Sequence, residues 1–358
     1  MKYRSLSNTS LKVSQICLGT MTFGEQNLEK DSFKIMDCAK EHGVNFFDTA
    51  EMYPTYPRIE TQGDSERIIG RWINKKKNRD KIIIATKISS GHPKGIGASG
   101  LKWIRGGSKK LKFDKKNIDK AVNDSLKRLN TDYIDIYQLH WPERNVPIFG
   151  QLDYRYDPKD NNWTPIPEVL ENLNNIIKQG KVRYIGLSNE TSWGISKYLS
   201  CSEKDNLPKP ISTQNGYNLI NRTYDISNSE ISMREKFSLL AHSPLAGGLL
   251  SGKYLFGKKP KNSRFTQRRK SFHIHNTNKT EKAIRKYLNI AKKYNMSLSS
   301  LAYAFVISRP FVTSCVIGAT SIKQLEKNIK SINLKLSNEI LMEIEKIHLS
   351  DPNPYIYI

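Results

Sequence analysis

The sequence has little cysteine and no long hydrophobic run. Its four cysteines, Cys17, Cys38, Cys201 and Cys315, are widely separated in a chain of 358 residues and form no Cys-x-x-Cys pair. This spacing argues against a zinc site and a disulfide framework, and it favours a reducing, cytoplasmic environment. The most hydrophobic stretch, 301–308, is too short to cross a bilayer, and the first ten residues lack the apolar core of a signal peptide. We therefore expect a soluble protein with no membrane association.

Acidic residues are also scarce. The chain has 34 Asp+Glu against 58 Lys+Arg, which gives a formal net charge of +24. Such an excess is compatible with nucleic acid, an acidic membrane surface or a phosphate-bearing ligand. The basic residues are scattered or lie in short groups such as 75–77 and 258–259, without the single basic face and aromatic residues typical of a nucleic-acid-binding protein. No nucleic-acid partner is therefore expected.

Strand-like and helix-like patterns alternate along the chain. Eight strands are predicted at 15–18, 44–48, 82–86, 134–139, 182–187, 211–214, 238–242 and 313–317. Helical patterns lie at 31–42, 65–76, 115–128, 167–179, 191–200, 229–236, 281–294 and 298–308, with two more at 322–332 and 338–348. This alternation predicts one α/β domain over 1–358, a (β/α)8 TIM barrel with an N-terminal β-hairpin plugging its bottom and extra C-terminal helices.

The long connections follow strand ends, on the side where such barrels have their catalytic loops. They are 88–114, 141–165 and 253–279. Five aromatic residues in the first two are candidates for an apolar substrate wall: Trp103, Trp141, Tyr154, Tyr156 and Trp163. Exposed aromatic residues could equally form a contact between two copies of the chain, so a homo-oligomer is left open.

One motif suggests a different fold. Gly95, Gly97 and Gly100 form a G-x-G-x-x-G pattern, which is the fingerprint of a dinucleotide-binding Rossmann unit. That fingerprint requires a strand running directly into it and a helix beginning at its last glycine. Here SSGHPK separates the pattern from the preceding strand and LKWIRGGSKK follows it, so the Rossmann interpretation is rejected.

Four polar residues come at or just after the ends of three predicted strands. Asp48 ends one strand and Tyr53 follows five residues later, while Lys87 and His140 follow the next two strands. Each has an ordinary explanation taken alone, as a turn, a surface or a structural residue. Because the ends of parallel strands meet at one mouth of a barrel, their joint occurrence predicts an active site.

Together these residue types suit the reduction of a carbonyl group. Tyr53 would donate a proton to the oxygen, which requires its pKa to fall from about 10, and the Lys87 ammonium would lower it. Asp48 would hold and orient the lysine. The His140 imidazole would polarise and position the carbonyl oxygen.

The chain resembles the aldo-keto reductases from end to end, and more narrowly their Tas-like branch. The matching segments are CLGTMTFG, NFFDTAEMYP followed by ETQGDSE, IIIATK, YIDIYQLHWPER, GKVRYIGLSNET, TQNGYNLINR, HSPLAGGLLSGKY, SRFTQ and VIGATSIKQLEKNI. The resemblance implies an eight-stranded barrel that uses NADPH without a Rossmann domain. It also implies that Asp48, Tyr53, Lys87 and His140 form a catalytic tetrad with Tyr53 as general acid.

The resemblance also implies where the cofactor binds. Ser188, Asn189 and Gln214 would hold the nicotinamide carboxamide, and Ser243, Leu245, Gly247 and Leu249 would surround the pyrophosphate. Gly19, Thr20, Met21, His242 and Pro244 are further cofactor-binding residues that the resemblance implies. The adenosine end would bind within Gly318 to Asn328, which includes Thr320, Ser321, Lys323 and Gln324. Locally, Ser321-x-x-Gln324 resembles a capping box, and such a helix start next to Lys323 suits a 2′-phosphate, with Arg264 adding a second charge. NADP is therefore preferred to NAD.

Two features depart from the family pattern. Where relatives place an aromatic residue that stacks on the nicotinamide, this chain has His242. The segment 88–114 is basic and glycine-rich. This composition is typical either of a solvated insertion or of a loop that binds an acidic substrate. We therefore expect an NADPH-dependent reductase of a small aldehyde or ketone, with a nucleotide-sensing regulatory subunit of low turnover as the alternative.

Overall fold

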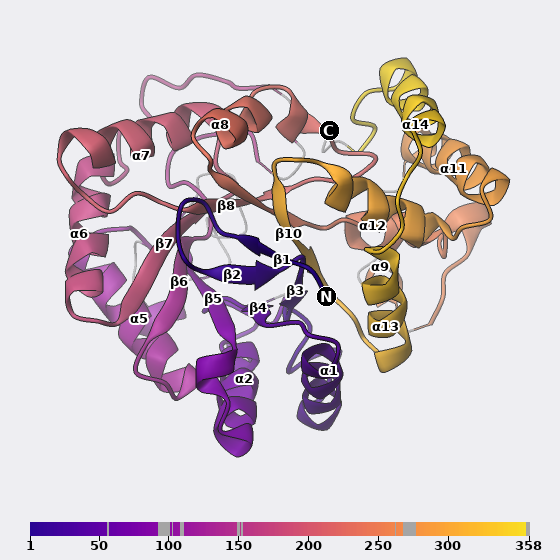
Figure 1. Cartoon of the computed structure of the whole chain (residues 1–358). Coiled ribbons are helices and arrows are strands. Elements are labelled where there is room, and N and C mark those ends of the chain that lie inside the picture. The colour runs from indigo at the N-terminus through magenta and orange to yellow at the C-terminus, as the bar shows by residue number, and fades with distance from the viewer. Residues whose placement is uncertain are drawn as a thin grey trace.

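Eight parallel strands form a closed barrel in the computed structural model, which describes residues 1–55, 57–91, 101, 103–107, 111–148, 151, 153–261, 263–267 and 277–355 (Figure 1). The strands are β3 (Ile16–Gly19), β4 (Phe46–Asp48), β5 (Ile83–Ile88), β6 (Ile134–Leu139), β7 (Val182–Ser188), β8 (Ser212–Gly216), β9 (Ser238–His242) and β10 (Val312–Ile317). They pair in sequence order, and β10 pairs with β3 to close the ring. All eight predicted strands are confirmed, with boundaries that agree within two residues. The three glycines of the rejected Rossmann pattern lie outside the described residues.

Helices surround the barrel (Figure 1). The ten predicted helices are confirmed as α1 (Glu29–Glu41), α2 (Asp64–Lys76), α5 (Lys115–Leu129), α6 (Ile166–Lys178), α7 (Ser192–Lys204), α8 (Asn228–Arg234), α11 (Asn278–Lys293), α12 (Leu298–Ser308), α13 (Ile322–Ser331) and α14 (Asn338–Ser350). The sequence did not predict the short helices α4 (Ile104–Gly107), α9 (Arg264–Gln267), η1 (Arg79–Lys81), η2 (Thr223–Asp225), η3 (Ala246–Ser251) and η4 (Leu255–Gly257). All six have one or two turns, too few for a helical period to show.

Burial follows the expected periods. In α6, Val169, Leu173 and Ile176 are buried against the barrel, while Glu168 and Glu171 are exposed on the other face. In the strands, alternate side chains fill the barrel interior, where Phe46, Ala85 and others form a cluster separate from the layer between strands and helices. Two residues after the interior residues Phe46 and Ala85 come Asp48 and Lys87. Side chains of a strand that are two positions apart lie on the same face, so these two point toward the mouth of the barrel.

An N-terminal hairpin closes the opposite end of the barrel. Its strands β1 (Tyr3–Ser5) and β2 (Lys12–Ser14) pair antiparallel and lie across the near end of the ring in Figure 1. Leu6 and Val13 are fully buried and join the interior cluster. The backbone N–H of Ser7 donates to the Ser238 hydroxyl at the start of β9, at 2.8 Å. The predicted plug at the barrel bottom is confirmed.

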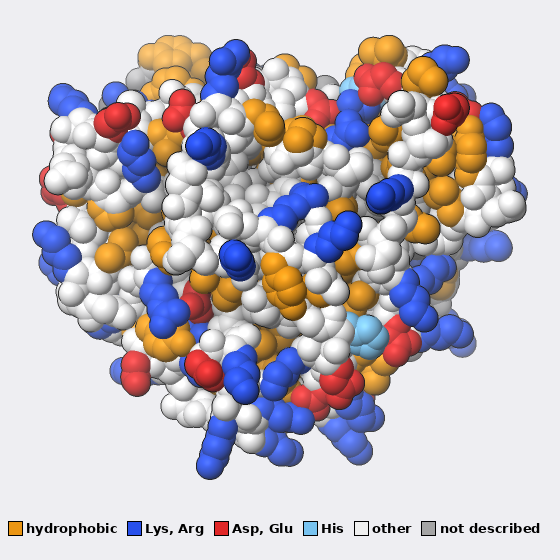
Figure 2. Space-filling model, in the orientation of Figure 1, with side chains coloured by type: hydrophobic (Ala, Val, Ile, Leu, Met, Phe, Trp, Pro, Cys, Tyr) orange, Lys and Arg blue, Asp and Glu red, His pale blue; other side chains and the backbone are white. Residues whose placement is uncertain are grey.

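Charged side chains are dispersed over the face of the molecule shown in Figure 2. Lysine and arginine side chains spread over the rim and centre of the face shown in Figure 2 and do not gather into one band. Among the described residues, no helix is long and apolar enough to cross a membrane, and no group of histidine, cysteine and acidic side chains is arranged to hold a metal. The four cysteines are unpaired and buried.

Candidate active site

A cleft of about 1340 Å³ opens at the mouth of the barrel where the strands end. Asp48, Tyr53 and His140 line it, and Lys87 lies fully buried beneath them. Sixteen of the nineteen predicted cofactor residues also line the cleft: Gly19, Thr20, Met21, Ser188, Asn189, Gln214, His242, Ser243, Pro244, Leu245, Gly247, Arg264, Gly318, Thr320, Gln324 and Asn328. The structure therefore brings the predicted tetrad and most of the predicted cofactor residues to one cavity.

A buried ion pair lies at the bottom of the cleft. Asp48 ends β4 and Lys87 is the last but one residue of β5, and the two strands are neighbours. The Lys87 ammonium donates to Asp48 Oδ2 at 2.6 Å and to the Thr49 carbonyl at 2.8 Å. Burial lowers the pKa of Lys87, but Asp48 and Tyr53 raise it more, so the net shift is upward. Lys87 is therefore a fixed cation at neutral pH.

Tyr53 lies above this pair, on the turn that follows β4. Its backbone N–H donates to the Ala50 carbonyl at 3.0 Å, and its carbonyl accepts from Gly63 N–H at 2.8 Å. The Lys87 ammonium lies 4.9 Å from the centre of the Tyr53 ring. The lysine predicted to act on Tyr53 is thus next to it.

The predicted fall in the pKa of Tyr53 is wrong for this structure. Burial raises the pKa of Tyr53, and the lowering effect of Lys87 offsets only part of that rise because Asp48 acts in the opposite direction. The net pKa lies above the ordinary value of about 10. Tyr53 therefore holds its proton throughout the neutral range, which is the form needed by a group that donates one.

His140 follows β6 and is buried beside Tyr53. The two rings meet edge to face with centroids 5.7 Å apart, and the Trp141 ring lies 4.4 Å from His140 on another side. Burial, together with Lys87 and His242, holds the pKa of His140 well below its ordinary value. Its Nδ1 is buried with no hydrogen-bond partner in the described structure. His140 is a neutral imidazole that can donate one hydrogen bond.

The predicted nicotinamide residues form a hydrogen-bonded floor at the ends of β7, β8 and β9. The Ser188 hydroxyl donates to the Gln214 carbonyl at 2.9 Å, and Gln214 Nε2 donates to Asp48 Oδ1 at 2.8 Å. Asn189 Nδ2 donates to the His140 carbonyl at 2.9 Å, and His242 Nε2 lies 3.3 Å from Asn189 Oδ1. These side chains are thus linked to the tetrad. Because the Gln214 Nε2 already donates to Asp48, this hydrogen bond competes with the one predicted to a nicotinamide carboxamide.

The predicted pyrophosphate residues lie on a backbone of unusual shape after β9. Ser243, Gly247 and Gly248 have φ values of 53°, 66° and 104°. A Cβ on Gly247 would lie 2.7 Å from the Phe265 ring, so glycine is required there both by conformation and by space. Leu249 differs from the other predicted pyrophosphate residues, because its side chain is buried in the hydrophobic core and does not line the cleft.

The predicted adenosine residues surround the start of α13. The Ser321 hydroxyl caps the helix by accepting from Gln324 N–H at 3.3 Å. The Gln324 side chain accepts from the N–H and hydroxyl of Thr320, at 3.0 Å each, so the capping box is displaced by one residue from its usual form. Lys323 is exposed, and neither it nor Ser321 lines the cleft, whereas Lys327 does.

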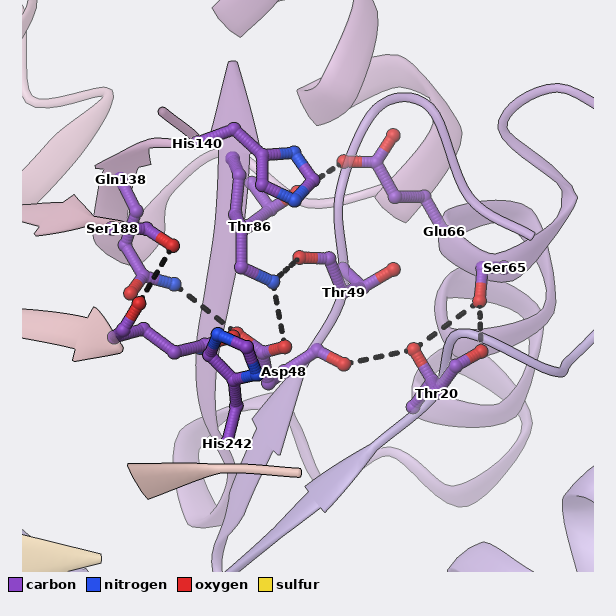
Figure 3. Close-up of polar contacts among 12 residues, drawn as sticks. Thr20, Asp48, Thr49, Ser65, Glu66, Thr86, Gln138, His140, Ser188 and His242 are labelled. Atoms are coloured by element: carbon purple, nitrogen blue, oxygen red, sulfur yellow. Dashed lines mark hydrogen bonds and ion pairs between the residues drawn. The ribbon is translucent and has the colours of Figure 1, made fainter. Parts of the chain in front are cut away.

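The sequence did not predict Gln138 as a site residue. Its Nε2 donates to Asp48 Oδ1 at 3.1 Å (Figure 3). Among the described residues, the Asp48 carboxylate also accepts from Lys87 and Gln214. Strand alternation could have found it, because Gln138 lies two residues before His140 on the same inward face of β6. Lys253 and Lys327 are two further cleft residues that were not predicted.

The predicted aromatic wall is largely wrong. Trp141 is buried and lines the cleft, but the other four aromatic residues do not. Trp103 and Trp163 are partly buried against hydrophobic clusters, and Tyr154 and Tyr156 are 58% and 77% exposed. The apolar lining near Tyr53 comes instead from Met21, Met52 and Ile148, together with Trp141. Much of the segment 88–114 lies outside the described residues.

Comparison with known proteins agrees with this arrangement. Residues 15–348 match the model of the aldo/keto reductase family. The chain belongs to this family. The chain is 43% identical over 354 residues to "Protein tas" of Escherichia coli, covering 97% of this chain and 98% of that protein. An "Uncharacterized oxidoreductase YrpG" of Bacillus subtilis is 33% identical, covering 97% and 96%. A "Probable voltage-gated potassium channel subunit beta" of Arabidopsis thaliana is 31% identical, covering 98% of each.

Membership of the aldo/keto reductase family confirms the predicted resemblance, including its Tas-like character, and it supports an oxidoreductase. Members of this family generally use NAD(P)H. The barrel with its hairpin and extra C-terminal helices is the fold expected of the family. The roles of the individual cleft residues rest on the geometry described above.

Proposed function

We propose that the chain is an NADPH-dependent reductase of aldehydes or ketones. The observation that carries this proposal is the buried Lys87–Asp48 pair directly below Tyr53, with neutral His140 beside it. A protonated tyrosine and a neutral imidazole meet at one point in the cleft. The tyrosine can protonate a carbonyl oxygen there, and the imidazole can polarise the same oxygen by donating a hydrogen bond. The four side chains come from three neighbouring strand ends and make up a complete set for this chemistry.

The cleft residues fit a dinucleotide. Gly318 has open space around its Cβ position at the cleft wall, and Ser243, Gly247 and Gly248, which have positive φ values, line the cleft after β9. Arg264 and Lys253 also line the cleft and would supply positive charge for phosphate groups. When bound, the reduced cofactor would supply the hydride.

The residues of the chain have separate tasks in the proposed reaction. His140 and Tyr53 hold the carbonyl oxygen, and the Tyr53 hydroxyl gives it a proton as negative charge develops there. Lys87 stabilises the tyrosinate that remains, and Asp48 keeps the ammonium in place through its 2.6 Å bond. Gln138 and Gln214 orient the carboxylate from two sides. Trp141 and Met52 exclude water from the site.

NADP is proposed over NAD because the predicted adenosine end lies near several cations. Lys327 lines the cleft on α13, and Arg264 lines it at the start of α9, where its guanidinium donates to Met21 Sδ at 3.8 Å. Exposed Lys323 lies one turn of α13 away from Lys327. The negative charge of a 2′-phosphate could pair with these cations.

We also propose that the substrate is a small carbonyl compound. The proposed location is the cytoplasm, whose reducing conditions suit four unpaired cysteines.

The test is NADPH consumption with a panel of aldehydes and ketones, comparing the wild type with Tyr53→Phe and Lys87→Met. We expect turnover in the wild type and a loss of at least roughly 10²-fold in both variants, with NADPH binding retained in Tyr53→Phe. Lys75→Met, which removes an exposed lysine, is the matched control and should behave as wild type. Undiminished turnover in Tyr53→Phe would remove Tyr53 from the mechanism.

A second candidate is a nucleotide-sensing regulatory subunit with little turnover. It is favoured by one observation, the similarity over nearly the whole chain to proteins named as probable potassium channel beta subunits. The four tetrad residues favour the enzyme. Stoichiometric NADPH binding by the wild type, with no consumption across the whole panel, would favour the regulatory subunit.

A further inference from the structure

His242 takes part in a chain of hydrogen bonds that reaches the tetrad. It ends β9 with its ring at the cleft, in the layer of inward side chains next to Leu240. His242 Nε2 lies 3.3 Å from Asn189 Oδ1, and Asn189 Nδ2 donates to the His140 carbonyl at 2.9 Å and to the Ser188 hydroxyl at 3.2 Å. The side chain of Asn189 thus connects the two histidines.

The donors and acceptors in this chain can be assigned. The His140 carbonyl only accepts, so the amide nitrogen of Asn189 must face it and the amide oxygen must face His242. An amide oxygen also only accepts, so His242 must carry its proton on Nε2. Burial, followed by Lys87 and Arg264, lowers the pKa of His242 to about 4, which leaves the ring neutral at physiological pH. The imidazole is therefore a neutral Nε2–H tautomer.

We propose that His242 is a positioning residue that fixes the Asn189 amide against the backbone of His140. Asn189 has a φ of 53°, a left-handed backbone conformation that asparagine adopts more readily than most residues. The Asn189 oxygen has two lone pairs, and His242 uses one of them. The other is left for an amide N–H, such as that of a carboxamide. Phenylalanine at position 242 would supply a ring face but no such hydrogen bond.

The proposal rests on the proposed reductase function for its kinetic test only. His242→Phe keeps a flat ring and loses the donor, whereas His242→Gln loses the ring and keeps an N–H of similar reach. We expect kcat/KM for the carbonyl substrate to fall roughly three- to tenfold in His242→Phe. His242→Gln should recover most of kcat/KM. The reverse order would show that His242 acts by stacking alone and would overturn the proposal.

A double-mutant cycle tests the partner. Once Asn189→Ala has removed the acceptor, adding His242→Phe should have no further effect on kcat/KM. Independent, additive losses from the two substitutions would contradict a direct hydrogen bond between these side chains. Thermal unfolding of all four proteins separates a loss of positioning from a loss of folded protein.

A spectroscopic measurement does not depend on turnover. The chain has seven histidines, and the His242 signals can be assigned in ¹⁵N-labelled protein by their absence from His242→Phe. We expect the Nε2–H tautomer, neutral at pH 7, and a change in the His140 environment in the variant. An Nδ1–H tautomer or a protonated ring at pH 7 would overturn the proposal. Lack of turnover with every carbonyl would contradict the proposed function, and the tautomer result would still decide this proposal.

Discussion

The protonation states in the cleft are set by burial more than by neighbouring charges. Burial keeps the proton on Tyr53 and keeps His140 and His242 neutral, while Lys87 stays charged because of its partners. Each group is thereby held in the form that the proposed carbonyl reduction requires. A site built this way does not need a group that titrates near neutral pH.

This protonation pattern makes a prediction for the pH dependence of reduction. The pKa of His140 is well below about 6.5 and that of Tyr53 is above about 10, so neither changes charge between these values. We expect kcat/KM for the free enzyme to be flat from about pH 6.5 to 10 and to fall above this range as Tyr53 loses its proton. Initial rates in overlapping buffers of constant ionic strength measure the profile. A clear inflection near pH 7 would show that one of these two groups titrates far from where burial places it.

The meeting of the four proposed tetrad residues at one cleft was predictable, because each comes at or just after a strand end that has a strong hydrophobic pattern. Gln138 was missed because it lies inside such a strand, where a single polar residue gives no signal unless inward and outward positions are first distinguished. The upward shift in the pKa of Tyr53 was not predictable either. It depends on how completely the surrounding loops cover the ring, and sequence does not give that quantity.

The loop between β5 and α5 is tied to the active-site turn by a buried ion pair. Arg105 Nη2 lies 3.4 Å from Glu51 Oε1, with both side chains 1% exposed, and Glu51 also accepts from Ser89 N–H at 2.6 Å. Arg105 Nη1 donates to Asn117 Oδ1 at 3.1 Å, at the start of α5. The described part of this basic loop therefore includes a structural anchor on the turn that carries Tyr53. Sequence could not pair Arg105 with Glu51, because the loop that carries Arg105 has no regular period.

Removal of this anchor should destabilise the fold in a pH-dependent way. Burial raises the pKa of Glu51 and Arg105 lowers it, so Arg105→Met should raise it further. A carboxyl group with a raised folded-state pKa costs stability when ionised, and that cost is relieved as pH falls through the folded pKa. We expect a loss of about 3–5 kcal/mol near pH 8 and a smaller loss near pH 5, from urea unfolding.

The control for this prediction is Arg155→Met. Arg155 pairs with Asp153 at 2.7 Å, but the two side chains are 79% and 62% exposed. An exposed pair of this kind contributes about 0–1 kcal/mol, so the variant should unfold nearly as the wild type does at both pH values. Equal losses for Arg105→Met at the two pH values would show that Glu51 is not the group that responds.

The N-terminal hairpin is an element of the core and not an appendage. Leu6 is fully buried in the barrel interior with Val13, Phe46 and Leu240. We expect Leu6→Ala to lower the free energy of unfolding by about 2–5 kcal/mol, because it leaves a cavity among large side chains. Leu28→Ala is the control, since Leu28 is 69% exposed and its loss should cost less than about 0.5 kcal/mol. Equal stability of both variants in chemical denaturation would mean that the hairpin does not support the barrel.

At the scale of the whole molecule, the order of strands and helices was predictable from sequence because each element repeats its own hydrophobic period. Closure of the barrel follows from eight such units. The path of the loops over the cleft was not predictable in the same way. Four of the five aromatic residues expected at the substrate wall do not line the cleft. The direction of a loop side chain depends on how the neighbouring loops pack, and the sequence has no periodic pattern that records this.

The net charge of +24 belongs to the molecule as a whole. Lysine and arginine are spread over the face in Figure 2, so contacts with DNA should be non-specific and governed by released counterions. Raising the salt from about 50 to 200 mM should weaken binding to a labelled duplex by roughly 10³-fold or more. NADPH would bind inside the cleft, where fixed groups contact it, and we expect it to lose less than tenfold over the same series. Fluorescence titrations of both ligands in matched buffers make the comparison, and tight, sequence-selective DNA binding that persists at 200 mM salt would contradict the expectation of no nucleic-acid partner.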